Sequence, residues 1–214
     1  MSGKMQWIDL DTWPRREHFA LYHSMDYPQF NLCMNLDVTN FLAFVKRSGI
    51  SFYYAMCFAS VRAANQFDEF RYRIRGERVV LHERVRPSFT DLEEGGDLFK
   101  IVTMDIGDDL IAFTREAAAR SKAQTCFLDA REQKWDDLIY ITCVPWVSFT
   151  QLTHPIALNR DDSIPRISWG KYFPQNGKIL LPFSIQANHA LIDGLQVGKY
   201  AAQLQRDLDG FCTA

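Results

Sequence analysis

Residues 178–194, Lys178-Ile-Leu-Leu-Pro-Phe-Ser-Ile-Gln-Ala-Asn-His189-Ala-Leu-Ile-Asp193-Gly194, contain a strong strand pattern that ends in a histidine and is followed by Asp-Gly. Between Lys178 and His189 every second residue is apolar, which is typical of a strand with one face in the protein core. The alternating residues are Ile179, Leu181, Phe183, Ile185 and Ala187. The same alternation turns His189 toward the buried face at the end of the strand. Asp193 can accept a hydrogen bond near His189 or cap the helix that follows.

His189 has the chemistry of a general base. Its unperturbed pKa lies near neutrality, so the neutral imidazole can accept a proton and then hold it. A structural interpretation competes with this one: His189 is then a satisfied core histidine and Asp193 an ordinary helix N-cap. The pattern His-x-x-x-Asp-Gly is short enough to arise by chance, so taken alone it leaves both interpretations open.

The segment Asn188-His189-x-x-x-Asp193-Gly194 resembles the HHxxxDG signature of CoA-dependent acyltransferases. This superfamily includes chloramphenicol acetyltransferases, dihydrolipoyl acyltransferases and condensation domains. Three further segments are similar to chloramphenicol acetyltransferases, in that family's order and spacing: residues 13–19, 145–150 and 170–172. The resemblance runs from about Trp13 to Leu208 and is weakest between about Lys100 and Trp135, where no family motif is found.

The resemblance implies direct acetyl transfer from acetyl-CoA to an acceptor hydroxyl, with His189 as the general base. It implies an oxyanion hydroxyl at Thr142, where the family has a serine. Ser168 matches a family threonine that helps to hold a water at the oxyanion. Arg15 is implied to form a buried, architectural ion pair with Asp193. Without the resemblance, Thr142 and Ser168 would be ordinary strand residues and Arg15 a solvated charge in a first helical turn.

The resemblance also implies a CoA-binding set and an acceptor pocket. Aromatic faces can pack against adenine and the pantetheine arm, and a lysine can meet a phosphate. The CoA set is Tyr53, Trp146, Lys171 and Tyr172. Core packing is the competing explanation for Tyr53 and Trp146, and solvation at a strand end for Lys171. The acceptor pocket is assigned to Tyr22, Asp26, Phe30, Thr90, Phe99, Tyr140, Leu152, His154 and Asp162.

Four pocket positions depart from the family. Asp26 and His154 stand where it usually has apolar residues, Asp162 where an aromatic residue is often found, and Tyr140 where asparagine is usual. A buried carboxylate without a partner penalises an apolar ligand. We therefore expect chloramphenicol to be acetylated more slowly than a more polar or cationic acceptor.

Composition bounds the remaining possibilities. The 214 residues are 47% hydrophobic with a net charge of −2, which fits a globular chain and provides no basic surface for nucleic acid. The five cysteines have no metal-ligand spacing, so no metal site is expected. We find no signal peptide and no apolar span of about 20 residues, which favours the cytoplasm and no membrane contact. The cysteines are Cys33, Cys57, Cys126, Cys143 and Cys212.

Helical and strand patterns alternate along the chain without a linker or repeat, so residues 1–214 are expected to form a single domain, and the resemblance implies that it is a CoA-dependent acetyltransferase domain. This mixture predicts an α/β (α+β) fold with a mixed β-sheet. The resemblance implies a two-layer sandwich in which this sheet packs against helices, chloramphenicol acetyltransferase-like. Helices are expected at 15–24, 39–47, 52–65 and 108–121, and a helix is expected after Asp193. Strands are expected at 30–36, 71–81 as a hairpin, 87–90, 99–104, 138–144, 167–172 and 178–189.

The family further implies a homotrimer with active sites at subunit interfaces, acting on a small-molecule hydroxyl acceptor, in the manner of an antibiotic resistance enzyme. Two alternatives stay open. One is a dihydrolipoyl-type acyltransferase core, disfavoured because no lipoyl or subunit-binding segment precedes residue 13. The other is a catalytically degenerate homologue that binds a ligand, which the change to Thr142 and the altered pocket suggest.

Overall fold

The computed structural model of the protein describes residues 4–93, 95–159 and 161–211. Cys212 lies outside the described residues. In chain order the elements are β1 (Met5–Trp7), α1 (Arg16–His23), β2 (Gln29–Asp37), α2 (Thr39–Ser48), α3 (Phe52–Ala64), α4 (Asp68–Arg71), β3 (Tyr72–Arg75), β4 (Arg78–His82), β5 (Arg86–Leu92), β6 (Phe99–Thr103), α5 (Leu110–Ala123), the 3₁₀ helix η1 (Glu132–Lys134), β7 (Leu138–Val144), β8 (Arg166–Gly170), β9 (Phe173–Gln175), β10 (Lys178–Asn188) and α6 (Gly194–Asp209).

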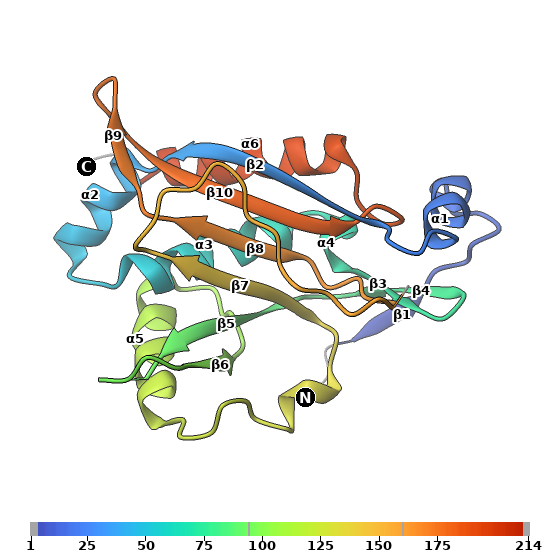
Figure 1. Ribbon diagram of the computed structural model, residues 1–214, viewed down its shortest axis with the longest axis horizontal. Helices are drawn as coiled ribbons and strands as arrows, with labels where there is room; N and C mark the ends of the chain where they lie inside the picture. Colours follow the sequence, from blue (N-terminus) through green and yellow to red (C-terminus); the bar gives the residue numbers. More distant parts are fainter. Residues whose placement is uncertain (1–3, 94, 160, 212–214) are drawn as a thin grey trace.

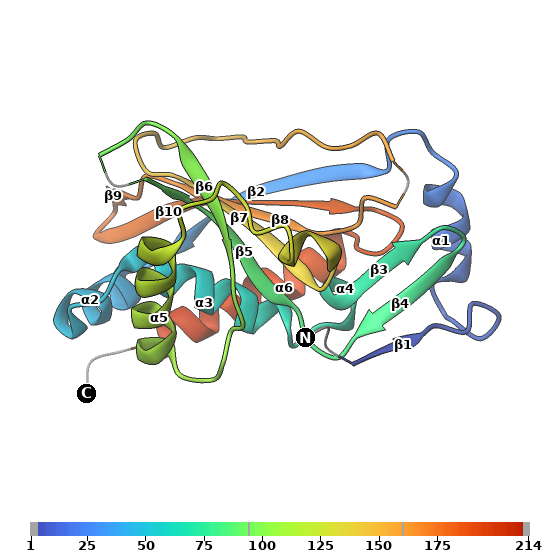
Figure 2. The ribbon, with the colours of Figure 1, turned by 90° about the horizontal axis from the view of Figure 1, so that it is seen from below.

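A large mixed sheet organises the molecule. Its strand order is β2-β10-β8-β7-β5-β6, and β9 pairs with β10 beside this path. The pairs β7–β8 and β5–β7 are parallel, and the other pairs in this sheet are antiparallel. Helices α2, α3, α5 and α6 lie on one side of the sheet, while the segment between β7 and β8 crosses the other side (Figures 1 and 2). The predicted two-layer mixed α/β fold is confirmed.

Strand β10 lies second from the edge and contributes to both faces of this sheet. Its predicted apolar residues point toward the helices, and Leu181, Phe183 and Ile185 are fully buried there. Phe183 stacks with Tyr200 of α6 at 6.5 Å between ring centroids. The Tyr200 hydroxyl in turn donates to the Ser60 carbonyl of α3, 3.2 Å away. The alternation therefore produces a strand that joins the sheet to both long helices behind it.

A second sheet of three strands, in the order β1-β4-β3, lies beside the large one (Figure 2). The hairpin predicted over residues 71–81 is confirmed as β3 and β4, with Gly76 at a positive φ of 59° in the turn. The sequence did not indicate β1, because its three exposed residues are too few to display an alternation. The predicted turn at Asn176-Gly177 joins β9 to β10, with φ of 49° and 76° at these residues.

The end of β10 differs from the prediction in one respect. The strand stops at Asn188, and His189 is the first residue of the turn that leads to α6. Its backbone N–H donates to the Pro28 carbonyl, 2.7 Å away, rather than continuing the sheet ladder. The orientation of the His189 side chain is therefore set by the turn and not by strand alternation alone.

Gly170 ends β8 at a place where two backbone segments approach closely. A Cβ atom at this position would lie 2.6 Å from the Val147 carbonyl oxygen and 3.0 Å from the Phe149 ring. The next residue, Lys171, donates its backbone N–H to the same Val147 carbonyl at 2.9 Å. The chain therefore requires glycine at residue 170 to bring residues 147 and 171 together.

We expect Gly170→Ala to lower the free energy of unfolding by about 1 to 3 kcal/mol, because the carbonyl that it meets belongs to the backbone and cannot rotate away. Gly198→Ala is the matched control. Gly198 lies inside α6 with open space around its Cα, so an alanine should be neutral or stabilise the helix by up to about 1 kcal/mol. Thermal and urea unfolding measure both changes. Equal stability of the two variants would contradict the close approach.

Candidate active site

The His189 ring lies between two aromatic side chains. It stacks on Tyr22 of α1 with 3.9 Å between ring centroids and an interplanar angle of 11°. Phe30 of β2 lies 4.6 Å from it in a tilted arrangement. The ring atom Nδ1 is buried and has no hydrogen-bond partner among the described residues. Two predicted pocket residues, Tyr22 and Phe30, therefore contact the predicted base directly.

Arg15 fixes the turn that carries His189. Its Nε atom donates to the Ala190 carbonyl at 3.0 Å and one terminal nitrogen donates to the His189 carbonyl at 3.1 Å. The other terminal nitrogen forms an ion pair with Asp193 at 3.0 Å. The predicted pair is present but only partly buried, because the Asp193 side chain keeps 29% of its surface exposed. One guanidinium thus holds both ends of the turn.

Asp193 combines the two roles that the sequence left open. One carboxylate oxygen accepts from the Leu195 N–H at 2.9 Å as the N-cap of α6, and Gln196 completes a capping box. The second oxygen accepts from Arg15. Burial raises the pKa of Asp193, but the hydrogen bonds from Arg15 and Leu195 outweigh it, so the net pKa lies below its ordinary value. The carboxylate is therefore ionised at neutral pH.

Asn188 stands where the resembled signature has its first histidine. Its side-chain oxygen accepts from the Ala190 N–H at 3.0 Å, and its side-chain nitrogen donates to the Asp162 carbonyl at 3.1 Å. Gln29 donates to the same carbonyl at 2.7 Å. The amide thus supports the His189 turn and ties it to the segment between β7 and β8.

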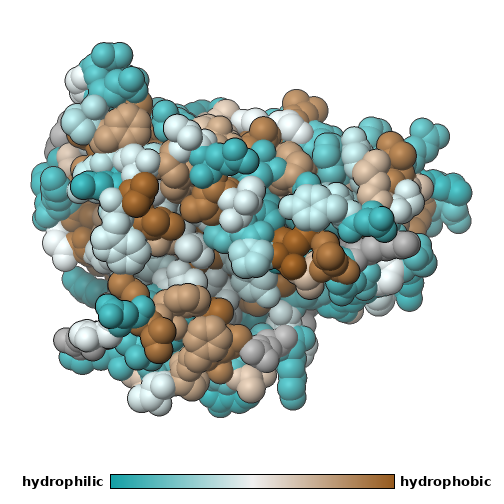
Figure 3. Space-filling model, in the orientation of Figure 1, coloured by the Kyte–Doolittle hydropathy of each residue, from teal (hydrophilic) through white to brown (hydrophobic). Residues whose placement is uncertain are grey.

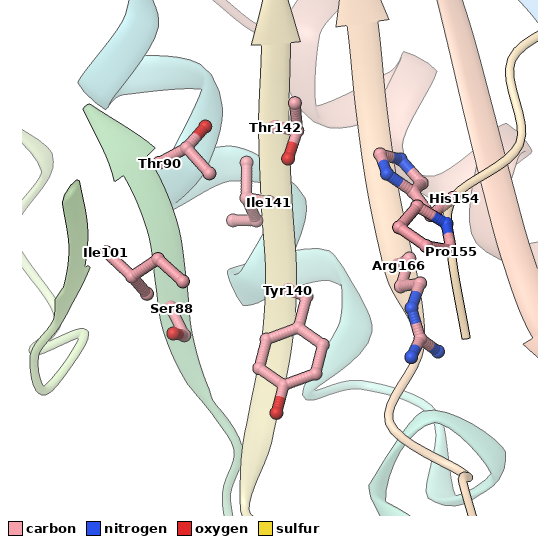
Figure 4. A pocket seen from close by; sticks show the side chains of 9 residues that line it. All are labelled: Ser88, Thr90, Ile101, Tyr140, Ile141, Thr142, His154, Pro155 and Arg166. Carbon is pink, nitrogen blue, oxygen red and sulfur yellow. The ribbon is translucent and has the colours of Figure 1, made fainter. Parts of the chain in front are cut away.

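A cavity of about 230 Å³ opens on the face of the sheet away from the helices (Figure 4). Strands β5, β6, β7 and β8 and the segment after β7 contribute its walls. The lining residues are Ser88, Thr90, Ile101, Tyr140, Ile141, Thr142, His154, Pro155 and Arg166. Four of them, Thr90, Tyr140, Thr142 and His154, were predicted as site residues. Most of the polar groups in the cavity are hydroxyls.

The two predicted oxyanion hydroxyls are neighbours across the sheet. Thr142 on β7 pairs with Ser168 on β8, so their side chains lie on the same face. Ser168 is fully buried, and its hydroxyl is in hydrogen-bond contact with Nε2 of His154. Thr142 is half-buried and lines the cavity. Leu152, also predicted here, lies two residues before His154 and accepts from Ser184 through its carbonyl at 3.1 Å.

Within one chain His189 does not meet these hydroxyls. Ser168 pairs with Ser184, which lies five residues before His189, roughly 17 Å along an extended chain. The faces also differ: Phe30 beside His189 pairs with Ala187 on the helix-covered face, while Ser168 belongs to the opposite face. The predicted catalytic residues therefore fall into two groups in the chain: His189 at the end of β10, and Thr142 with Ser168 on β7 and β8.

The predicted CoA residues gather where the parallel strands β7 and β8 end. Trp146 is 65% exposed, Lys171 is exposed and Tyr172 contacts Phe52 at its edge. Core packing is therefore excluded as the explanation for Trp146. Tyr53 differs from these three. Its ring packs 5.7 Å from that of Trp169, its hydroxyl donates to the Thr90 carbonyl, and burial raises its pKa well above the ordinary value.

The two acidic pocket residues do not behave as expected. Asp162 is paired with Arg166, from which both of its carboxylate oxygens accept, at 3.1 and 2.7 Å. Asp26 is exposed on the loop between α1 and β2. Phe99 lies on the edge strand β6 against Phe127, 5.8 Å between centroids, and does not line the cavity. The expected penalty from two unpaired buried carboxylates is therefore wrong.

The chain matches known proteins over nearly all of its length. The family model described as chloramphenicol acetyltransferase matches residues 4–205. The chain belongs to the chloramphenicol acetyltransferase family. A chloramphenicol acetyltransferase from Klebsiella sp is 29% identical over 206 residues, 94% of this chain and 93% of that protein. Chloramphenicol acetyltransferase 2 from Escherichia coli is 30% identical over 200 residues, 92% of this chain and 94% of that protein.

Solved structures agree with this membership. A chloramphenicol acetyltransferase superimposes with a TM-score of 0.88 at 26% identity, covering 96% of this chain and 100% of that chain. A probable dihydrolipoamide acetyltransferase from Listeria monocytogenes has a TM-score of 0.65 at 14% identity, covering 94% and 95%, and shares the fold alone. The protein is thus an acyltransferase of the chloramphenicol acetyltransferase family, which implies acetyl-CoA-dependent acetyl transfer.

Sequence reasoning missed five cavity residues: Ser88, Ile101, Ile141, Pro155 and Arg166. Arg166 is the most consequential, because it neutralises Asp162 and lies 5.6 Å from the centre of the Tyr140 ring. The four-residue spacing of Asp162 and Arg166 suggests a pair only in a helix, and this segment is a loop that enters a strand. Knowledge of the register between β7 and β8 would have predicted the contact with Tyr140, because Tyr140 pairs directly with Arg166.

We expect Asp193→Asn to lower the free energy of unfolding by about 1 to 2 kcal/mol, because asparagine keeps the N-cap but loses the charged contact with Arg15. The folded pKa of Asp193 is depressed, so its stabilisation is present above the unfolded pKa and lost as the pH falls through the folded one. The difference between wild type and variant should therefore shrink below about pH 4.

Asp11→Asn is the matched control for this measurement. Asp11 pairs with Arg16 at 3.2 Å, but both side chains are mostly exposed, so the change should be close to zero. Thermal unfolding at pH 7 and at pH 3 measures both variants. A destabilisation by Asp193→Asn that is absent at pH 7, or that grows in acid, would contradict the role given to the Arg15 pair.

Proposed function

We propose that this protein transfers the acetyl group of acetyl-CoA to a hydroxyl of a small-molecule acceptor. His189 is the general base, and Thr142 and Ser168 serve the oxyanion. The observation that carries the proposal is the placement of His189 in a turn whose two ends Arg15 holds by three hydrogen bonds. This clamp fixes the backbone that carries the imidazole, and the stacking on Tyr22 restricts the ring itself, as a positioned general base requires.

In this mechanism His189 moves one proton from the acceptor hydroxyl to the CoA thiolate. His189 takes the proton of the acceptor hydroxyl while that oxygen attacks the thioester carbonyl, which forms a tetrahedral intermediate. The Thr142 hydroxyl donates to the developing oxyanion, an interaction typically worth about 3 kcal/mol. The intermediate then collapses, the bond from carbon to sulfur breaks, and the imidazolium returns the proton to the CoA thiolate.

We propose that the complete site forms between two copies of the chain in a homotrimer. The support is the separation of His189 from Thr142 and Ser168 within one chain, since a base that far from the oxyanion groups cannot serve the same substrate. Apolar side chains also lie open on the face seen in Figure 3, as large exposed apolar groups do at subunit contacts. Among the exposed large apolar residues are Leu21, Met25, Tyr27, Leu32 and Leu158.

Acetyl-CoA is proposed to bind at the edge where β7 and β8 end. Trp146 and Tyr172 offer accessible ring faces, and Lys171 offers a charge for a phosphate. Thr142 and Ser168 lie two residues before Val144 and Gly170, the last residues of their strands, roughly 7 Å inward. A thioester reaching inward from this edge would therefore meet the oxyanion hydroxyls. Tyr53 then has a supporting role from the core side.

The acceptor is proposed to occupy the cavity, with its reacting hydroxyl directed at His189 of a neighbouring copy. The relatives bear the name of chloramphenicol, which is the first acceptor to test and would make this protein a resistance enzyme. Because Arg166 neutralises Asp162, no unpaired carboxylate there opposes an apolar ligand. The hydroxyls, His154 and Tyr140 still favour an acceptor with several hydrogen-bonding groups, which remains our expectation for the preferred substrate.

We also propose that the protein is cytoplasmic and that residues 1–214 form one domain. The described cysteines, Cys33, Cys57, Cys126 and Cys143, are free thiols, which suits a reducing cytoplasm. Burial raises the pKa of Cys143 to about 12, so this thiol acts as a small apolar group. Among the described residues no helix combines the length and apolar character needed to cross a membrane. One continuous apolar core supports a single domain over residues 1–214.

We expect wild-type protein to release free thiol from acetyl-CoA in the presence of chloramphenicol or a more polar hydroxyl acceptor, and His189→Ala to lower turnover at least about 100-fold. His18→Ala is the matched control, since His18 is exposed on α1 and should leave turnover unchanged. Circular dichroism checks that both variants fold. Turnover of His189→Ala within a few-fold of wild type would refute the base assignment.

The assay also separates the alternatives. Transfer to a thiol acceptor releases one thiol and consumes another, so with dihydrolipoamide the formation of CoA itself is measured by chromatography. CoA formed with dihydrolipoamide and not with hydroxyl acceptors would favour a dihydrolipoyl-type core. Binding of CoA without thiol release from any acceptor would favour a degenerate binding homologue.

A mixture of two inactive variants tests the shared site. We expect equal amounts of His189→Ala and Thr142→Val, unfolded and refolded together, to recover activity. In a random trimer with sites between neighbours, mixed assemblies carry one intact site, so about a quarter of wild-type activity should return. Each variant refolded alone is the control. If both residues served one site within the same chain, the mixture would stay inactive.

A further inference from the structure

The cavity contains a second histidine, for which the proposed mechanism has no role. His154 lies on the segment between β7 and β8 and lines the cavity together with Thr142 (Figure 4). Two buried side chains of β10 fix this segment. Gln186, which is 1% exposed, accepts from the His154 N–H at 2.7 Å and donates back to its carbonyl at 3.4 Å. Ser184 donates to the Leu152 carbonyl. These contacts from the strand beneath fix the backbone of residue 154, which places the imidazole at the cavity wall.

The contact of this imidazole is with the buried hydroxyl of Ser168. Nε2 of His154 and Oγ of Ser168 are in hydrogen-bond contact, and Ser168 has no exposed surface. A hydroxyl is one donor and an acceptor, so the proton on Nε2 decides what Ser168 can do. If Nε2 carries the proton, Ser168 accepts from it and keeps its own O–H for donation. If Nε2 carries no proton, Ser168 donates its only O–H to the histidine and has none left to donate to the oxyanion.

We propose that His154 is a positioning residue for acetyl transfer: it donates from Nε2 to Ser168 and so leaves the Ser168 O–H directed at the oxyanion side of the cavity. This inference rests on the proposed function. It adds a residue that acts through Ser168 and does not itself exchange a proton with the substrate. His189 and His154 then have separate tasks, one moving the proton and one orienting a hydroxyl.

The surroundings of His154 favour the neutral ring, so the tautomer decides whether Nε2 carries the proton. Burial, followed by the nearby positive charge of Arg166 on β8, holds the pKa of His154 below its ordinary value. Arg166 is itself paired with Asp162, and Tyr140 of β7 lines the same cavity. Among the residues that line the cavity, the titratable ones are Tyr140, His154 and Arg166. At neutral pH the ring thus has one N–H, and a measurement can show whether Nδ1 or Nε2 carries it.

Two substitutions at His154 separate positioning from packing. Leucine removes the donor, while glutamine presents an amide N–H close to the place of Nε2–H. We expect His154→Leu to lower kcat about tenfold, as loss of one oriented hydrogen bond does, and His154→Gln to restore it to within about threefold of wild type. The KM for acetyl-CoA should stay within about twofold, because the CoA edge is untouched. Thr153→Ala, an exposed neighbour, is the control and should match wild type.

A kcat of His154→Leu within twofold of the Thr153→Ala control would overturn the proposal, as would a glutamine variant as slow as the leucine variant. Thermal midpoints of all three variants identify any that fail to fold. If leucine does not fold, the glutamine variant and the measurement below still decide the matter.

Nitrogen NMR of the histidine side chains provides a readout that does not require turnover. The chain has five histidines, so the His154 signals are identified by their absence in His154→Gln. We expect the Nε2–H tautomer at pH 7.5 and a change in its Nε2 shift in Ser168→Ala. The Nδ1–H tautomer, or signals unaffected by Ser168→Ala, would overturn the proposal. If wild type releases no thiol with any acceptor, the proposed function fails, while the tautomer still tests the contact itself.

Discussion

Strand β10 is the constraint on which both halves of the candidate site depend, because it is buried on both faces. On one face Leu181, Phe183 and Ile185 pack toward the helices. On the other, Ser184 and Gln186 bind the backbone of the segment that carries His154. A shift of one residue in its register would exchange these two faces. The strand thus fixes the cavity wall, and its end fixes the start of the His189 turn.

The same strand supports the proposal that two copies of the chain complete the site. Its residues near Ser168 and its end near His189 are separated by the rise of an extended chain, which side-chain rotation cannot shorten. Bringing base and oxyanion hydroxyls together therefore requires a second copy or a different substrate path. Of these, association of identical chains uses surfaces that each copy already has, and the proposal relies on the large apolar residues that one chain leaves exposed.

Local patterns predicted most of the fold. Alternation in residues 178–189, the Asn176-Gly177 turn and the hairpin at Gly76 all carry their own conformational signal, and the structure contains each of them. The candidate site was less predictable. The partner of Asp162 depends on how a loop enters β8, and the exposure of Trp146 depends on where two parallel strands end together. Such facts are set by tertiary contacts, which spacing along the chain does not encode.

Asp162 shows how the two separated groups remain mechanically joined. Its carboxylate binds Arg166, whose guanidinium lies near the Tyr140 ring in the cavity. Its carbonyl accepts from Gln29 and Asn188, which adjoin His189. A single residue therefore contacts the cavity wall with its side chain and the base-bearing end of β10 with its backbone. Because buried polar networks hold one geometry when every member is satisfied, displacement of one group would strain the other. The acidic residue that sequence reasoning treated as a penalty on the acceptor is thus a structural link between the two groups.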